Sequence, residues 1–301
     1  MENKIIYNDD GTKEKEIVYQ EEDRSKKESV CTFYPNGKLK IKIYYQSDGV
    51  TKDWEATHWE NGHEKTEAWY QSDGVKKEWE ATYWVNGNKK TEIGYQSDGV
   101  KKDWEATHWE SGNLKTEIVY QVDGVTKDWE ATHWENGNVK RETVYRKDGV
   151  TKRWERNYNK SGGVETYSAY WEKGHKRKHV VYQADGVKKA WEYTYWESTG
   201  NPKTFVAYDK DSKEKRTEKT YWENGNTETC IEYCGIEKWI ECLHWENGNR
   251  RHKRVYNDDG ITMEREETWW ENGNKKTVIF FESDGRTISE SYNYSERGER
   301  I

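Results

Sequence analysis

The sequence KDWEATHWE occupies residues 52–60, 102–110 and 127–135, and a close copy, KEWEATYWV, occupies residues 77–85. Around these stretches the chain reads as four copies of one 25-residue phrase, which begin at Tyr45, Tyr70, Tyr95 and Tyr120. The phrase is Y-Q-x-D-G-V-x-K-x-W-E-A-T-x-W-x-x-G. Repetition of this kind predicts an array whose units contact only their neighbours, with one extended surface in place of a single core and pocket.

Glycines mark the predicted turns. Most of the 24 glycines recur at alternating spacings of roughly 12 and 13 residues, and two gaps hold glycine-free turns, around Asp23, Arg24 and Ser25 and around Asp211 and Ser212. The segments between turns are rich in Val, Ile, Thr, Tyr and Trp, as strands are. Loops this short join antiparallel strands and cannot make a parallel crossover. The sequence therefore predicts an all-β fold: an elongated, single-layer, twisted antiparallel β-meander of about 25 short strands, built from 25-residue two-strand repeats.

A six-bladed propeller is the alternative fold, because about 25 strands can be divided into fours. Propellers need a distinct longer connection between blades, and the regular spacing of turns shows none. We therefore expect one β-repeat array over residues 1–301. Residues 1–44 are expected to form N-terminal capping repeats, residues 45–144 the four near-identical repeats, and residues 145–301 degenerate repeats and a C-terminal cap.

The composition indicates a sheet held together by aromatic residues. The chain is 32% hydrophobic and 36% charged, yet contains 18 Trp and 22 Tyr. Its net charge of -7 comes from closely mixed acids and bases, which leaves no basic stripe for nucleic acid. No membrane span or targeting signal is evident, so we expect a cytoplasmic protein or one of an organelle interior. The four cysteines lack a CxxC spacing and predict free thiols in a reducing compartment; they are Cys31, Cys230, Cys234 and Cys242.

The two classes of turn predict which side chains share a face. Asp-Gly turns favour a two-residue type I′ loop, whereas turns such as Pro35, Asn36 and Gly37 favour a three-residue loop with a left-handed glycine. Counting these loops places one largely apolar set of side chains on one face: Val50, Trp54, Ala56, His58, Thr66, Ala68 and Tyr70. It places a charged set on the other face: Asp53, Glu55, Thr57, Trp59, Lys65, Glu67 and Trp69.

Two columns of tryptophan follow from this register. The apolar face is expected to carry a row that is structural or binding: Trp54, Trp79, Trp104, Trp129, Trp154, Trp191 and Trp239. The charged face is expected to carry a carbohydrate-binding row: Trp59, Trp84, Trp109, Trp134, Trp196, Trp222, Trp245 and Trp270. Cross-strand packing explains the first row well. Aromatic rings among carboxylates and hydroxyls suit a sugar, whose C–H faces stack while its hydroxyls bond to polar neighbours.

Nothing in the sequence indicates catalysis, a metal site or a cofactor. No nucleophile elbow, phosphate-binding loop or H-E-x-x-H motif occurs. The equivalent residues His58, His108 and His133 lie one or two repeats apart, too far to share one zinc ion, and are expected to pack. A column of glutamates, including Glu55 and Glu67, is expected to be neutralised by lysines such as Lys65, or else by a divalent cation.

Two families resemble this chain. The stretch FYPNGKLKIKIYY at 33–45 and the recurring W-E-N-G-N-x-K resemble MORN-like repeats of the bacterial antitoxin type. That resemblance implies a single-layer antiparallel sheet acting as a protein-interaction scaffold.

The density of W-E-x-x-x-W, as in Trp54 to Trp59, is similar to the tryptophan-rich domain of plant early starvation proteins, which implies binding of starch glucans through rows of aromatics. We therefore expect a non-enzymatic protein that binds a polymeric glucan. The alternatives are a protein-interaction scaffold and a structural or self-assembling protein, whose apolar face could pair with a second copy.

Overall fold

The structure, a computed structural model, describes residues 4–210 and 213–301. The predicted turn at Asp211 and Ser212 lies outside the described residues. By backbone contacts the chain divides into two units, Met1–Val150 and Thr151–Ile301. The described residues form strands and turns and contain no helix.

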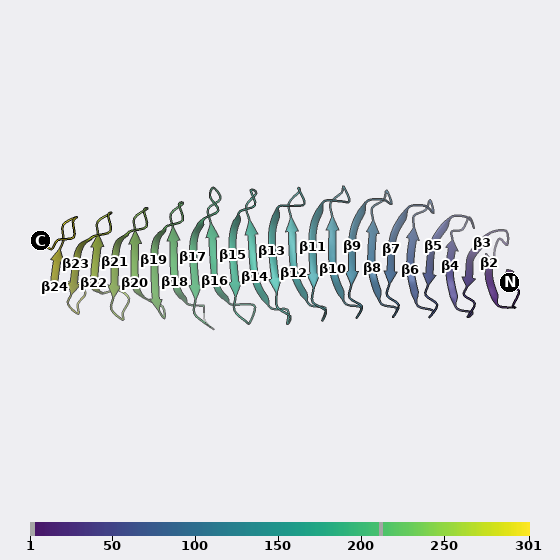
Figure 1. Cartoon of the computed structure of the whole chain (residues 1–301), viewed down its shortest axis with the longest axis horizontal. Coiled ribbons are helices and arrows are strands. Elements are labelled where there is room, and N and C mark those ends of the chain that lie inside the picture. Colours follow the sequence, from purple (N-terminus) through teal and green to yellow (C-terminus); the bar gives the residue numbers. More distant parts are fainter. Residues whose placement is uncertain (1–3, 211–212) are drawn as a thin grey trace. The chain divides into compact units, whose positions relative to one another are not determined.

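Each unit contributes half of the strands found in the described residues, and these strands follow one another in chain order (Figure 1). The first unit contains β1 (Lys4–Tyr7), β2 (Lys13–Tyr19), β3 (Lys27–Phe33), β4 (Leu39–Tyr45), β5 (Lys52–His58), β6 (Glu64–Tyr70), β7 (Lys77–Tyr83), β8 (Lys89–Tyr95), β9 (Lys102–His108), β10 (Leu114–Tyr120), β11 (Lys127–His133) and β12 (Val139–Tyr145). The second unit contains β13 (Lys152–Tyr158), β14 (Val164–Tyr170), β15 (Lys176–Tyr182), β16 (Lys189–Tyr195), β17 (Pro202–Tyr208), β18 (Lys215–Tyr221), β19 (Thr227–Cys234), β20 (Glu237–His244), β21 (Arg250–Tyr256), β22 (Met263–Trp269), β23 (Lys275–Phe281) and β24 (Ile288–Asn293).

Within each unit every strand pairs antiparallel with its neighbours in sequence and contacts no other strand of the described residues. Strand β1 pairs only with β2, and β24 only with β23, so the sheet does not close. This confirms the predicted all-β antiparallel meander. The propeller alternative is wrong, because its blades would bring strands distant in sequence into contact.

Hydrogen-bonded ladders take the place of a thick core. The most buried apolar side chains are small alanines, such as Ala56 at 0% and Ala131 at 2% exposure. At the strand ends beside the Asp-Gly turns, the Gln46 side-chain amide donates to the carbonyl of Gln71, 3.2 Å away in the next repeat. The equivalent bond recurs one repeat later. At the opposite strand ends, the Asn61 side-chain amide donates to the Val85 carbonyl at 2.8 Å. Each repeat is therefore hydrogen-bonded to the next at both sets of turns.

The Asp-Gly turns of the first unit also stack on one another. In each turn the aspartate fixes the loop: Asp48 Oδ1 accepts hydrogen bonds from the backbone of Val50 at 2.9 Å and of Thr51 at 2.8 Å. The following turn lies against it, because a Cβ atom placed on Gly74 would lie only 2.5 Å from Thr51 Cγ2. Glycine is thus required here both for its positive φ of 63° and for this close approach.

The strand register differs from the predicted one. Trp54 pairs with Trp69, and Ala56 pairs with Glu67, so these four side chains share a face. Ala68 instead lies opposite Glu55, on the other face. The predicted faces are therefore wrong for every second strand.

A β-bulge beside each turn explains the difference. In the hairpin of β5 and β6, His58 faces Glu64 while Thr57 faces Thr66, which leaves Lys65 unpaired. The next hairpin leaves Glu78 unpaired in the same way, between the partners of Tyr70 and Trp69. Each bulge inverts the following strand. Two inversions cancel over one repeat, so the 25-residue period is kept although the assignment of faces changes.

The second unit contains a change of face that the tryptophan columns did not predict. Trp154 pairs with Ala169, Ala169 with Lys178, and Lys178 with Thr194, so these four side chains share one face. Trp191 shares the other face, opposite Val181. The assignment of both tryptophans to one column is therefore wrong. The physical reason is one extra strand. Trp191 follows Trp154 by 37 residues, which is one 25-residue repeat plus 12 residues more.

Trp239 is also misplaced in the predicted row. Ile240 pairs with Glu232 and Lys238 pairs with Tyr233, so Trp239 is the unpaired residue of a bulge. Its side chain is 52% exposed. Ile240 takes the position that Trp54 holds in the first unit, because Trp239 follows the turn glycine by four residues, whereas Trp54 follows its own by five.

Removal of one whole repeat should preserve the fold of the first unit. Deleting residues 95–119 joins Gly94 to Tyr120, which is equivalent to Tyr95, so every remaining strand keeps an equivalent neighbour. Stability of such arrays is close to a sum of repeat and interface contributions. We expect a cooperatively folded, shorter protein with a proportionally smaller urea m-value, measured by circular dichroism. Loss of the strand signal would show that the repeats are not independent units.

Candidate binding surface

A row of directly opposed side chains crosses the first unit on one face. We call it the aromatic stripe; its members, from β4 to β12, are Tyr44, Trp54, Trp69, Trp79, Gly94, Trp104, Val119, Trp129 and Val144. Strands are about 4.8 Å apart, so the stripe is about 40 Å long. Its aromatic residues are half-buried, except for Trp69, which is 44% exposed.

The rings at the start of the stripe contact one another. The ring centroids of Tyr44 and Trp54 are 5.6 Å apart, and those of Trp54 and Trp69 are 6.1 Å apart. Where the stripe reaches Gly94, the indole of Trp104 occupies the space, because a Cβ on Gly94 would lie 2.2 Å from Trp104 Nε1. The glycine therefore lets the aromatic surface continue across β8.

A second row on the same face alternates alanine with glutamate beside the stripe. Its members are Ala56, Glu67, Ala81, Glu92, Ala106, Glu117, Ala131 and Glu142. The Glu67 carboxylate accepts hydrogen bonds from Trp54 Nε1 at 2.8 Å, Trp69 Nε1 at 3.1 Å and the Tyr83 hydroxyl at 2.6 Å. These bonds fix the orientation of both indoles, so the rings at this end of the stripe are held in place before any ligand arrives.

The histidines at the end of these strands are buried or half-buried. Burial lowers the pKa of His58, His108 and His133, which favours their neutral forms. His108 Nε2 lies 3.4 Å from a Glu92 oxygen. Among the described residues, no group of three or more His, Cys, Asp or Glu side chains could hold a metal ion.

The opposite face carries paired threonines and a repeated lysine–glutamate–tyrosine contact. Thr57 and Thr66 hydroxyls lie 2.6 Å apart across β5 and β6. Glu55 accepts hydrogen bonds from Lys52 at 2.7 Å and from the Tyr70 hydroxyl at 2.5 Å. Burial opposes ionisation of Glu55, but these two bonds outweigh it and lower its pKa.

The prediction of a single acidic column is therefore wrong. Glu55 and Glu67 lie on opposite faces, because a bulge separates their strands. Lysine does neutralise the Glu55 type of residue, but the partner is Lys52, three residues earlier on the same strand, and not Lys65.

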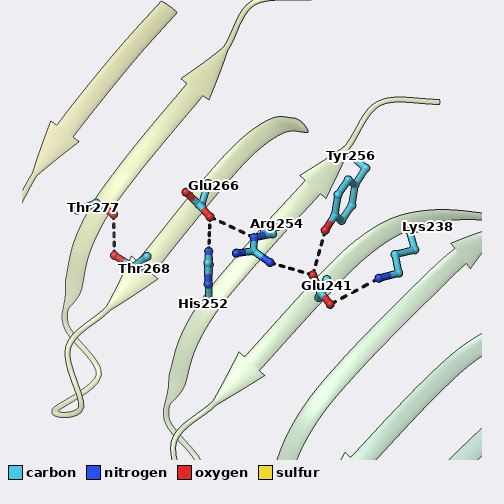
Figure 2. A network of polar contacts seen from close by, with 8 residues as sticks. All are labelled: Lys238, Glu241, His252, Arg254, Tyr256, Glu266, Thr268 and Thr277. Atoms are coloured by element: carbon cyan, nitrogen blue, oxygen red, sulfur yellow. Dashed lines mark hydrogen bonds and ion pairs between the residues drawn. The ribbon is translucent and has the colours of Figure 1, made fainter. Parts of the chain in front are cut away.

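Figure 2 shows the second unit's version of this contact, centred on Glu241. Glu241 lies 3.7 Å from the Lys238 ammonium, accepts a hydrogen bond from the Tyr256 hydroxyl at 3.0 Å and one from Arg254 at 3.3 Å. Arg254 also donates to Glu266 at 3.1 Å, so one guanidinium bridges carboxylates on two strands.

The predicted carbohydrate-binding row lies beside the Asn-Gly type of turn. A lysine or arginine lies over most of its rings, with the charged group 4.3–4.8 Å from the ring centroid. The pairs are Lys65 on Trp59 at 4.7 Å, Lys90 on Trp84 at 4.6 Å, Lys115 on Trp109 at 4.6 Å, Lys140 on Trp134 at 4.5 Å, Lys203 on Trp196 at 4.4 Å, Arg251 on Trp245 at 4.8 Å and Lys276 on Trp270 at 4.3 Å. The indole nitrogens point inward: those of Trp196 and Trp270 donate to the carbonyls of Tyr221 and Tyr294 in the next repeat. The nitrogens of Trp59, Trp84, Trp109, Trp222 and Trp245 are buried without a partner. One ring face is thus occupied by a cation, and the predicted binding role of this row stays a prediction.

The second unit gathers aromatic residues around Trp191. Its ring centroid lies 5.3 Å from that of His179 and 5.5 Å from that of Tyr193. Tyr193 in turn contacts Phe205 at 4.6 Å. Trp154, on the opposite face, lies 5.7 Å from the Arg156 guanidinium.

The sequence interpretation missed two members of the aromatic stripe, Tyr44 and Trp69, because it assigned Trp69 to the other face. It also placed Val50 on a sheet face. Val50 instead lies at a turn and is 78% exposed. The equivalent valines of the four near-identical repeats form what we call the valine ridge: Val50, Val75, Val100 and Val125. The repeated Gly-Val pair after each aspartate was the available signal.

The comparisons with known proteins do not identify the chain. No protein-family model matches it, and no curated protein matches it. Among solved structures, it is similar to TcdB2-TccC3-Cdc42 at 11% identity and a TM-score of 0.22, covering 99% of this chain and 18% of that one. A Photorhabdus luminescens Tc holotoxin pore gives 11% identity, a TM-score of 0.22 and the same coverage. A porin-like protein from Bacteroides uniformis gives 11% identity and a TM-score of 0.19 over 79% of this chain and 92% of that one.

The chain thus spans less than a fifth of the length of the first two of these structures. The described residues contain no helix that could cross a membrane. TM-scores this low carry no conclusion about what the chain binds.

Proposed function

We propose that this protein is a non-enzymatic binding protein for an extended neutral polysaccharide, with a glucan as the leading candidate, and that the polymer lies along the aromatic stripe. The observation that carries the proposal is the continuous run of rings at Tyr44, Trp54, Trp69 and Trp79, which lie directly opposite one another on four neighbouring strands. Stacking on each ring is individually weak. By analogy with nucleic-acid bases it contributes about 1–3 kcal/mol, and a polymer adds such contacts through avidity.

The charge beside the stripe supports a neutral polymer. Glu67, Glu92 and Glu117 recur along the adjacent row, so a polyanion would meet like charges. Carboxylates that already accept indole and phenol hydrogens keep lone pairs that hydroxyl groups can use. Cations lie over rings of both rows, since Lys42 is 4.5 Å from the ring centroid of Tyr44 and Lys89 is 5.4 Å from that of Trp79. The aromatic stripe is the better candidate than the Trp59 row, because its rings lie directly opposite one another on neighbouring strands and Trp69 is 44% exposed.

The test compares two triple variants. Changing Trp54, Trp69 and Trp79 to Leu should weaken binding at least tenfold, measured by pull-down with insoluble starch and cellulose and by fluorescence titration with a soluble glucan. Changing Trp59, Trp84 and Trp109 to Leu is the matched control and should change affinity less than about twofold. Circular dichroism checks that both variants fold. The proposal fails if the wild type binds neither polymer, or if the control loses as much affinity as the stripe variant.

A protein-interaction scaffold is the second candidate, and the valine ridge favours it. Val75 is 80% exposed and Val125 is 79% exposed, and the nested turns hold them at a fixed repeat. Exposed apolar residues in a row indicate a contact surface. If neither polymer binds, changing Val50, Val75, Val100 and Val125 to Ser should abolish capture of a stoichiometric protein partner without loss of fold.

A further inference from the structure

We infer that Cys230 and Cys242 form a reversible redox site, in which an intramolecular disulfide links β19 to β20. The two residues lie directly opposite each other across these strands, so their side chains share a face. Both are free thiols in this structure, and Cys242 is 8% exposed. The inference is independent of polysaccharide binding.

The spacing of opposed residues allows the bond but strains it. Directly opposed residues in an antiparallel pair have Cα atoms about 4.5–5.5 Å apart, within the range of about 4.4–6.8 Å found in disulfides. Their Cβ atoms are about 4.5–5.5 Å apart, whereas a disulfide needs about 3.5–4.5 Å. The strands must therefore approach by up to about 1 Å. Strained disulfides are the easily reduced, regulatory kind.

Charges of both signs surround the pair. Lys219 lies directly opposite Cys230 on β18, and Lys253 lies directly opposite Cys242 on β21. Arg250 also favours the charged form of Cys242, whereas Glu232 and Glu241 oppose it. Burial dominates and raises the pKa of both thiols. Oxidation should therefore be slow near neutral pH and accelerate as pH rises.

The other two cysteines do not compete for this bond. Cys234 lies four residues from Cys230 on the same strand, which is about 13 Å along it, beyond the reach of a disulfide. It is exposed beside the two-residue turn, where it pairs with Glu237. Cys31 is buried in the first unit. Cys234 is therefore the residue at which a simple mixed disulfide is expected.

A low-molecular-weight disulfide such as oxidised glutathione supplies the oxidising equivalents. The thiolate of one cysteine attacks a sulfur of the reagent, which forms a mixed disulfide and releases one glutathione thiolate. The thiolate of the second cysteine then attacks the protein sulfur of that mixed disulfide and releases the second glutathione. In total two protein thiols lose two protons and two electrons, and one reagent disulfide becomes two thiols.

The experiment exposes the native protein, residues 1–301, to oxidised glutathione between pH 7 and 9. Peptide mapping should find residues 230 and 242 joined, with a rate that rises about tenfold per pH unit below the thiol pKa. Dithiothreitol should restore both free thiols.

The variants C230S and C242S should each lose the bond, and C234S should keep it. The map of the wild type is decisive even if a serine variant fails to fold. Glutathione attached to Cys234 with Cys230 and Cys242 still reduced would overturn the inference, as would a bond that C234S abolishes.

Discussion

The variant Gly74→Ala is expected to lose about 2–5 kcal/mol of unfolding free energy, measured by urea denaturation. Alanine at a φ of 63° costs about 1–2 kcal/mol. Its Cβ would also lie 2.5 Å from Thr51 Cγ2 and 2.9 Å from the backbone nitrogen of Lys52. The backbone atom begins β5 and cannot move without breaking that pairing. Overpacking of this kind adds about 1–3 kcal/mol.

Gly37→Ala is the matched control, because Gly37 has a φ of 78° but nothing within 4 Å of the position of its Cβ. It should lose only about 1–2 kcal/mol, the contribution of the left-handed backbone. Equal losses in the two variants would mean that the stacking of neighbouring turns adds nothing to stability.

Acid should destabilise the second unit through Glu192. Burial opposes ionisation of this carboxylate, but hydrogen bonds from Lys178 at 2.9 Å, Lys189 at 3.0 Å and the Tyr208 hydroxyl at 2.9 Å outweigh it. Together they lower its pKa from 4.5 to about 2. Because the folded-state pKa is the lower one, the stabilisation is present above pH 4.5 and is lost as the pH falls towards 2.

The variant Glu192→Gln should therefore be about 2–3 kcal/mol less stable than the wild type at pH 7, and the difference should vanish by about pH 2. Glu246→Gln, at an exposed turn residue, is the control and should change stability by less than about 0.5 kcal/mol. Urea unfolding across this pH range measures both. A difference between Glu192→Gln and wild type that stays constant with pH would show that the carboxylate acts through packing and not through its charge.

The repeat period and the positions of the turns were predictable because glycine and aspartate act locally. The predicted two-residue loop at the Asp-Gly turns is wrong. The Gln46 N–H donates to the Thr51 carbonyl, so residues 47–50 form a four-residue loop, and Gly49 N–H donates to the Gln46 carbonyl. Each predicted Asp-Gly turn depends on a positive φ and on an aspartate that accepts backbone hydrogens, as Asp48 does. Both properties belong to a few consecutive residues. The strand class followed from the same reasoning, since loops of this length join only antiparallel neighbours.

The faces were not predictable from those turns alone. The bulges at Lys65 and Glu78 lie outside the loops, at positions where the residue types look like ordinary strand. One unpaired residue reverses every side chain that follows. Trp69 therefore joined the aromatic stripe without any change in the pattern of turns. Trp239 left the predicted row because it occupies the unpaired position of a bulge.

The close contact between lysine and tryptophan was also hidden from the sequence. Lys65 was expected to neutralise glutamate, but its ammonium lies 4.7 Å from the ring centroid of Trp59. The bulge turns Lys65 and its equivalents toward the tryptophan before the turn. A lysine that follows a tryptophan by six residues across an Asn-Gly turn therefore predicts this contact between cation and ring.

Strands β5, β9 and β11 consist of the same seven residues, KDWEATH, so side-chain chemistry gives β10 no preference among them. Chain connectivity decides instead, because β10 is joined to β9 and to β11 by short turns. Hairpins with short turns close within about 1–10 μs, before longer loops that would bring β5 to β10. Correct assembly of the near-identical repeats therefore depends on neighbouring strands pairing faster than distant ones. A longer connection inserted at any turn of this region would slow the native pairing and let interchangeable strands exchange partners.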